Sequence, residues 1–209
     1  GRYPAPGLPE LAEEVADATR PDYIGADTDS WGLDHGTWSV LVHAFPDADI
    51  PVVQLSINAQ KPPEYHLELG AKLARLRERG VLLLGSGNVV HNLRAIDWKR
   101  EDHGFDWARR FEEHATEVLS ERPGDAASLV EHPDYAMAAP TAEHFLPVLY
   151  AAGFAAQAGL PLEQPIAGYA YGSLSMTCHV AGMAPQAAEA GLPGVAPLGT
   201  NVPPEESNI

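Results

Sequence analysis

Residues 50–88 read IPVVQLSINAQKPPEYHLELGAKLARLRERGVLLLGSGN, and this segment carries the strongest indication of the fold. Two short apolar runs, at 50–57 and 81–84, flank an amphipathic helical pattern over residues 64–79 that ends at Gly80. Continuous apolar runs are typical of strands that are buried on both faces of a parallel sheet. The order strand, helix, strand therefore predicts a βαβ unit and an α/β fold.

Helical periodicity, turn-forming residues and apolar runs predict the remaining elements. They are a helix at 8–18, a loop at 25–36, a helix or strand at 37–45 capped by Thr37, a helix at 105–120, a helix at 142–156 that Pro147 kinks or delays, and an irregular strand at 166–180. We expect residues 1–180 to form a single α/β domain and residues 181–209, rich in Ala, Gly and Pro, to form a mobile tail.

The composition excludes several classes of function. The 209 residues include 29 Asp and Glu against 13 Lys and Arg, a formal charge of −16, which argues against binding to nucleic acid or to an anionic membrane surface. No apolar run is long enough to span a membrane. A single cysteine, Cys178, excludes an internal disulfide and a cysteine-based zinc cluster, and the absence of a leader predicts a cytoplasmic protein.

Three of the nine histidines lie where a site would be expected. His35 lies in the loop WGLDHG (31–36), His91 follows the turn GSGN (85–88), and His144 precedes a predicted helix. The turn GSGN follows a predicted strand, which is where open α/β sheets bind ligands, but it matches neither a dinucleotide fingerprint nor a phosphate loop. On these four residues alone, a plain strand-to-helix turn is the favoured interpretation.

Each histidine also has a structural interpretation. His91 could be a core histidine bonded to a backbone carbonyl, His35 an exposed loop residue, and His144 a helix-cap or surface residue. His66 and His114 lie on charged helices and are expected to be solvated, whereas His179 next to Cys178 is discounted as a catalytic pair. Without GxSxG or HExxH, the residues alone suggest a metal-dependent enzyme and do not name its reaction.

Six blocks, taken together and in order, resemble one known family. They are YPAPGLPELA (3–12), WGLDHGTWSVL (31–41), FPDADIPVVQLSI (45–57), GSGNVVHNLR (85–94), PTAEHFLPVLYAAG (140–153) and GSLSM (172–176). These blocks are similar to those of the 4,5-DOPA extradiol dioxygenase family, within the class III extradiol ring-cleavage dioxygenases. The resemblance covers nearly all of residues 3–176.

The resemblance implies a central mixed sheet flanked by helices and a non-haem metal centre holding Fe(II) or Zn(II). It implies that His144 and His91 lie at the metal, His144 as a ligand and His91 as a ligand or neighbour that takes a catechol proton. It implies that His35 faces the substrate as an acid or base. Two further ligands in relatives come from HGSP and SAHW motifs upstream of the YPAPG block. Neither motif occurs in these residues, so we expect the fold and metal site to be incomplete at the N-terminus.

The expected activity is extradiol cleavage of a catechol, DOPA-like in structure, with O2 as the second substrate. Two alternatives remain open from the sequence. The same histidines could hold zinc and activate water in a hydrolase, or the chain could be a truncated relative without activity. The cysteine, the charge and the histidines do not separate these alternatives.

Overall fold

The computed structural model describes residues 3–27 and 30–183, and the greater part of the predicted tail lies outside them. The helices are α1 (Pro9–Ala18), α2 (His35–Ala44), α3 (Pro63–Leu73), α4 (Asp106–Glu121), α5 (Tyr135–Ala138) and α6 (Leu146–Ala158), with 3-10 helices η1 (Ala74–Arg79), η2 (Leu93–Ala95) and η3 (Pro123–Glu131). The strands are β1 (Leu162–Ile166), β2 (Tyr169–Ala170), β3 (Leu174–Ser175) and β4 (Cys178–Ala181). Among the described residues, no helix has the length and apolar character needed to cross a bilayer.

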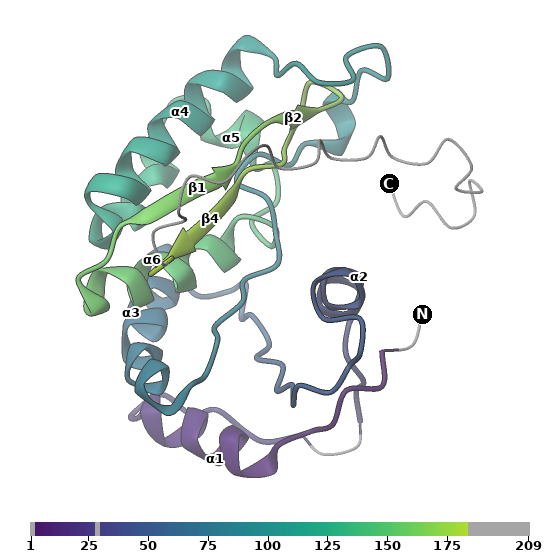
Figure 1. The fold of residues 1–209 in the computed structure, drawn as a ribbon. Coiled ribbons are helices and arrows are strands. Elements are labelled where there is room, and N and C mark those ends of the chain that lie inside the picture. Colours follow the sequence, from purple (N-terminus) through teal and green to yellow (C-terminus); the bar gives the residue numbers. More distant parts are fainter. Residues whose placement is uncertain (1–2, 28–29, 184–209) are drawn as a thin grey trace.

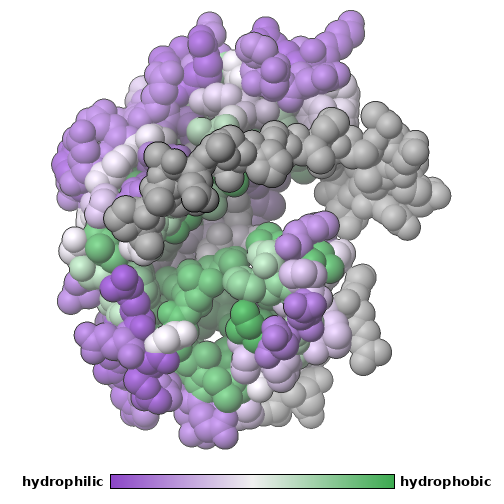
Figure 2. Space-filling view, in the orientation of Figure 1, coloured by the Kyte–Doolittle hydropathy of each residue, from purple (hydrophilic) through white to green (hydrophobic). Residues whose placement is uncertain are grey.

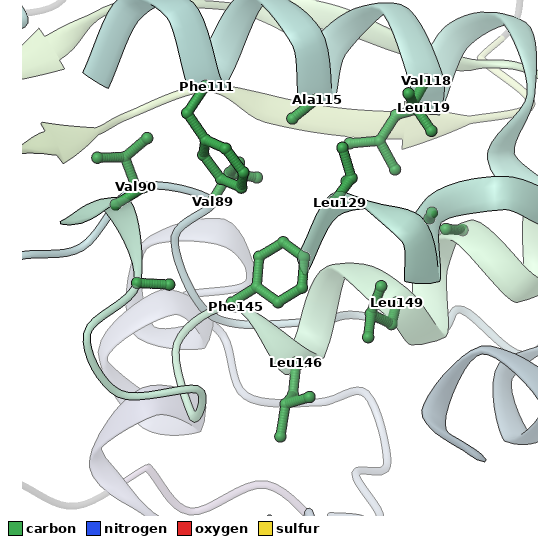
Figure 3. Packing of buried hydrophobic residues seen from close by; sticks show 14 of the residues in the cluster. Val89, Val90, Phe111, Ala115, Val118, Leu119, Leu129, Phe145, Leu146 and Leu149 are labelled. Carbon is green, nitrogen blue, oxygen red and sulfur yellow. The ribbon is translucent and has the colours of Figure 1, made fainter. Parts of the chain in front are cut away.

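The main core forms where α4, η3 and α6 meet (Figures 1 and 3). Phe111 of α4, Phe145 and Leu149 are completely buried, as is Leu129 of η3. The predicted stripe at 105–120 therefore faces inward, because its apolar residues recur at the helical period. Helix α6 starts at Leu146 with a proline in its first turn, which confirms the late start that Pro147 predicts.

Helices α3 and α6 cross in backbone contact. A Cβ atom on Gly153 would overlap the carbonyl oxygen of Leu67, and a Cβ atom on Gly70 would overlap that of Tyr150. Glycine on both helices lets the axes approach more closely than larger side chains would permit. The predicted helix at 64–79 forms as α3 continued by η1, and Gly80 ends it in the left-handed conformation.

Two small antiparallel sheets replace the single irregular strand that was predicted at 166–180. β1 pairs with β4, and β2 pairs with β3. Gly168 and Gly172 have positive φ angles, so the chain reverses where a continuous strand was expected. Ala181, predicted to begin the tail, ends β4.

The predicted strands at 50–57 and 81–84 do not form, and the prediction of a βαβ unit is wrong within the described residues. A strand requires a neighbouring strand with which it exchanges a series of backbone hydrogen bonds. In the segment 50–57, a single such bond is seen among the described residues, from the N–H of Val52 to the carbonyl of Pro6. Val81 and Leu83 pack beside α3, whereas Leu82 and Leu84 are 69% and 41% exposed. Figure 2 shows apolar residues gathered on this face of the molecule.

Candidate functional site

Two of the three predicted histidines are brought together. The rings of His91 and His144 stack with their centroids 3.6 Å apart and their planes 9° from parallel. Both residues are partly buried. They come from separate segments of the chain, so the contact is created by the tertiary fold.

Core packing fixes the segment on which each histidine lies. Val90 precedes His91 and is fully buried, and Phe145 follows His144 and is also fully buried. Figure 3 shows these two flanking side chains among the core residues. Because the neighbouring side chain is anchored in each case, the imidazole is held at the edge of the core.

Backbone contacts bring the two segments into register. The N–H of Asn88 donates to the carbonyl of His144 at 2.9 Å, and the N–H of His91 donates to the carbonyl of Ala138 at 2.7 Å. A Cβ atom on Gly87 would overlap the same His144 carbonyl. The absence of a side chain at Gly87 therefore allows these two segments of the chain to approach closely.

The last strands complete this scaffold. The side-chain amide of Asn88 donates to the carbonyl of Ser175 at 2.6 Å, and His91 forms an isolated antiparallel bridge with Leu174. Asn88, a candidate pocket residue by its place in the GSGN turn, thus uses its amide to tie that turn to β3. Its role in this structure is to position His91.

The environment keeps the His91 imidazole neutral. Burial lowers its pKa below the usual value for histidine, and the neighbouring His144 lowers it further, while Glu143 opposes the shift. The hydroxyl of Thr141 donates to a carboxylate oxygen of Glu143 at 2.7 Å and lowers the pKa of that carboxyl. A neutral imidazole next to a carboxylate can bind a metal or accept a proton.

His35 occupies the first position of α2 and is exposed. Its ring meets Trp38 edge-on at 5.1 Å. The helix is capped by Asp34, whose carboxylate accepts from the N–H of Thr37 at 2.8 Å, so the prediction of Thr37 as the cap is wrong. Because the helix begins at His35, Thr37 lies inside the first turn, and its N–H is one of the groups that the Asp34 cap satisfies.

The start of α2 lies beside the GSGN turn. The position of a Cβ on Gly36 is 3.5 Å from the hydroxyl oxygen of Ser86. His35 is thus on an element next to the turn that leads to His91. Among the described residues, the His35 ring contacts Trp38 and does not stack on His91 or His144.

Two other histidines differ from their predicted surroundings. His66 is fully buried between α3 and α6, with Nδ1 3.1 Å from the Tyr150 hydroxyl, because it lies on the α3 face that the close helix crossing covers. His114, expected to be solvated, is partly buried and stacks on His132 at 5.1 Å. Charged neighbours in the sequence do not reveal which helix face a histidine occupies.

Metal-binding capacity follows from the donor set. Imidazole nitrogens suit both Fe(II) and Zn(II), and His91 and His144 provide two such rings in contact. In residues 3–27 and 30–183, no group of three or more His, Cys, Asp or Glu side chains is arranged to hold a metal ion. The pair therefore fits part of a metal site and not a full three-ligand set.

Comparison with known proteins identifies a family and several relatives. The family described as the catalytic LigB subunit of aromatic ring-opening dioxygenase matches residues 2–175. A 4,5-DOPA dioxygenase extradiol of Escherichia coli K12 is 44% identical over 178 residues, which are 83% of this chain and 65% of that protein. The corresponding Beta vulgaris protein is 35% identical over 160 residues, which are 75% of this chain and 59% of that protein.

A solved structure has the same fold. The crystal structure of an uncharacterized E. coli K12 protein superposes with a TM-score of 0.77 at 41% identity, covering 85% of this chain and 74% of that one. The α/β class expected from the sequence is thus confirmed. The chain spans somewhat less than two thirds of the curated relatives above. The match of the LigB family to residues 2–175, together with this fold, shows that the chain belongs to the LigB family of aromatic ring-opening dioxygenases.

Proposed function

We propose that this chain carries the activity of an extradiol dioxygenase, which opens a catechol ring with O2 at a non-haem metal centre. Membership of the LigB family and the names of the E. coli and Beta vulgaris relatives support the reaction class. The relatives named for 4,5-DOPA support a DOPA-like catechol as the substrate. We assign the activity to a single domain of residues 1–180.

The stacked pair of His91 and His144 is the observation that carries this proposal. Both histidines lie inside the stretch matched by the family, and backbone hydrogen bonds hold their segments together. We propose His144 as a metal ligand and His91 as a second ligand or immediate neighbour. When bound, Fe(II) would supply the redox chemistry between catechol and O2, whereas Zn(II) would act only as a Lewis acid.

His91 and His35 would transfer protons to and from the catechol. The lowered pKa of His91 leaves its imidazole neutral near pH 7, so it can accept a proton from a catechol hydroxyl. His35, exposed at the start of α2 beside the GSGN turn, would exchange a proton with the substrate. The partly buried setting of His91 excludes much of the competing water.

The test is oxygen consumption coupled to product formation. The chain is loaded anaerobically with Fe(II), mixed with L-DOPA and air, and followed by an oxygen electrode and by the absorbance of the yellow ring-opened product. We expect both signals, with loss of at least about a hundredfold, a typical acid–base contribution, in His91→Ala and in His144→Ala. His103→Ala is the matched control, because the His103 side chain is 77% exposed.

The outcomes separate the alternatives. Zn(II) loading should give no oxygen consumption, because zinc has no redox chemistry. Ester hydrolysis by the zinc form without oxygen use would support a hydrolase instead. A metal-loaded chain that consumes no oxygen with any catechol would overturn the proposal, as would full activity in His144→Ala.

We further propose the reducing cytoplasm as the working compartment. Cys178 is free and exposed, which suits a compartment that keeps thiols reduced. Fractionation of the source cells with an antibody to the chain would test this assignment.

A further inference from the structure

A cavity outside the proposed metal site is lined by residues of α4, β1 and the turn before β2. It has a volume of about 310 Å³. Figure 1 shows β1 and β4 running beside α4. Its polar lining comes from Glu112, Glu113, Thr116, Gln164, Tyr169 and Thr177. None of these residues belongs to the proposed metal site.

Glu112 is the unusual member of this lining. The residue is 5% exposed, and neither carboxylate oxygen has a hydrogen-bond partner among the described residues. Burial raises the pKa of the Glu112 carboxyl, and the nearby hydroxyls of Thr177 and Ser175 partly oppose this shift by favouring the charged form. Because a buried carboxylate without close donors is costly, a ligand that donates hydrogen bonds to Glu112 would stabilise its charged form.

His179 does not meet this need as a cation. Its side chain is 6% exposed and its Nε2 lies 4.0 Å from Oε1 of Glu112, beyond hydrogen-bond distance. Burial lowers the pKa of His179 to about 4, so the ring is neutral at pH 7. The side-chain amide of Gln164 donates to the carbonyl of Leu162 at 2.7 Å and lies 3.4 Å from Nδ1 of His179.

The charges around the cavity favour a cation. Glu113 adds a second carboxylate at the exposed side, and the nearby guanidinium of Arg109 is paired with Asp106 at 2.9 Å. Burial and both carboxylates raise the pKa of Tyr169 to about 12, so the phenol keeps its proton. The Tyr169 ring packs against Gly104, which leaves a fixed aromatic wall.

We propose that this cavity binds a small primary ammonium ion, with the Glu112 carboxylate as its anchor. An ammonium group has three N–H donors, which match the unpartnered oxygens of Glu112 and the hydroxyl of Thr177. The Tyr169 ring can contribute a cation–π contact. Because two carboxylates line the cavity, a neutral donor or an anion would bind there less favourably than a cation. This inference does not depend on the dioxygenase activity.

The test is a titration of the full chain with n-butylammonium chloride at constant ionic strength, followed by two-dimensional amide NMR. We expect saturable shifts confined to residues of α4, β1 and β2 around the cavity. Glu112→Gln should weaken binding at least tenfold, because the amide keeps the volume and loses the charge. Glu121→Gln is the matched control, since Glu121 lies on the same helix, is exposed and is outside the cavity.

Two further probes and one further variant keep the test decisive. 1-Butanol lacks the charge and tetramethylammonium lacks the N–H donors, so neither should saturate. Circular dichroism checks whether Glu112→Gln folds. If it does not, Ala167→Phe provides an independent test, because the larger side chain fills the cavity from the turn before β2 and should abolish binding. Equal binding by Glu112→Gln, equal binding of tetramethylammonium, or no saturable shifts, as in a water-filled cavity, would overturn the proposal.

Discussion

Gly87 is the residue on which the geometry of the candidate site depends most directly. Its backbone lies against the carbonyl of His144, and the next residue, Asn88, bonds to the same carbonyl. A side chain at position 87 has no space without moving one of the two segments. The separation of the His91 and His144 rings therefore depends on Gly87, which has no side chain that could take part in the reaction.

We predict that Gly87→Ala lowers kcat/KM for a catechol at least tenfold, about 1.4 kcal/mol, because it separates the two rings. Affinity for Fe(II), measured anaerobically by competition with a chromogenic chelator, should fall in parallel. Gly32→Ala is the control, because no atom lies within 4 Å of the Cβ position at Gly32. Unchanged activity in Gly87→Ala would show that the close approach does not set the site geometry.

Histidine burial gives the protein a predicted acid sensitivity. In the folded state the pKa of His179 is about 4, and in the unfolded chain it returns to about 6.5. Between these values the unfolded state binds more protons, so the free energy of unfolding falls as the pH falls from 6.5 towards 4. For one proton, the free energy of unfolding changes by at most about 1.4 kcal/mol per pH unit.

The facing carboxyl acts in the opposite direction, because burial raises the pKa of Glu112 above its value in the unfolded chain, so the folded state binds this proton at a higher pH than the unfolded chain does. Urea unfolding of the native chain and of His179→Gln at pH 7, 6 and 5 isolates the histidine contribution. We predict that the variant gains stability relative to the native chain as the pH falls. A constant difference across the three pH values would contradict the buried neutral state of His179.

At the scale of elements, the crossing of α3 and α6 governs the fold around the site. Leu69 and Leu73 of α3 and Tyr150 of α6 share one cluster, and α6 also carries Leu149 into the main core. The crossing thus joins two clusters and fixes the start of α6, which directly follows His144. A substitution at the contact between α3 and α6 should therefore alter the geometry of the histidine pair by shifting α6.

We predict that Gly153→Ala destabilises the chain by about 3 kcal/mol, the upper part of the range for overpacking, because its Cβ meets the Leu67 carbonyl. Gly124→Ala on η3 is the control, since its Cβ position is 3.7 Å from Ala156, an ordinary contact. Urea denaturation followed by circular dichroism measures both. Equal midpoints in the two variants would show that the helices can separate without cost.

The elements also show how far the sequence could be interpreted. The 3.6-residue period at 105–120 predicts α4 and its buried face correctly, because a helix satisfies its backbone within itself. The runs at 50–57 and 81–84 have strand composition, yet a strand depends on a neighbour that composition cannot supply. The helices at 8–18, 64–79, 105–120 and 142–156 were therefore predicted, and 37–45 was left open between helix and strand. η3, α5, the strand pairing and the hairpin turns at Gly168 and Gly172 were not predicted.

Across the whole molecule, the exposed apolar surface contrasts with the charge of −16. Leu82, Leu84 and Ile50 are 69%, 41% and 47% exposed, while Val81 and Leu83 point towards the cluster on α3. Neighbouring exposed apolar side chains on an extended segment favour association. Net negative charge opposes it, so association should increase as salt screens the repulsion.

We predict that the double variant Leu82→Lys, Leu84→Lys lowers light scattering at high salt without lowering the free energy of unfolding by more than about 0.5 kcal/mol, the usual range for surface changes. Val81→Lys, Leu83→Lys is the matched comparison on the covered face and should destabilise the chain. Scattering that is equal in the native chain and the first variant would contradict the role of this surface.

The sequence by itself determined the helices, the candidate histidines and the family resemblance, because periodicity and residue order are properties of the chain. Only the tertiary structure decided which histidines meet. His91 and His144 stack because Val90 and Phe145 are buried in one core and Gly87 allows the backbones to touch. It also decided that Glu112 and His179 face each other, since burial and pairing depend on contacts between distant segments and not on local composition.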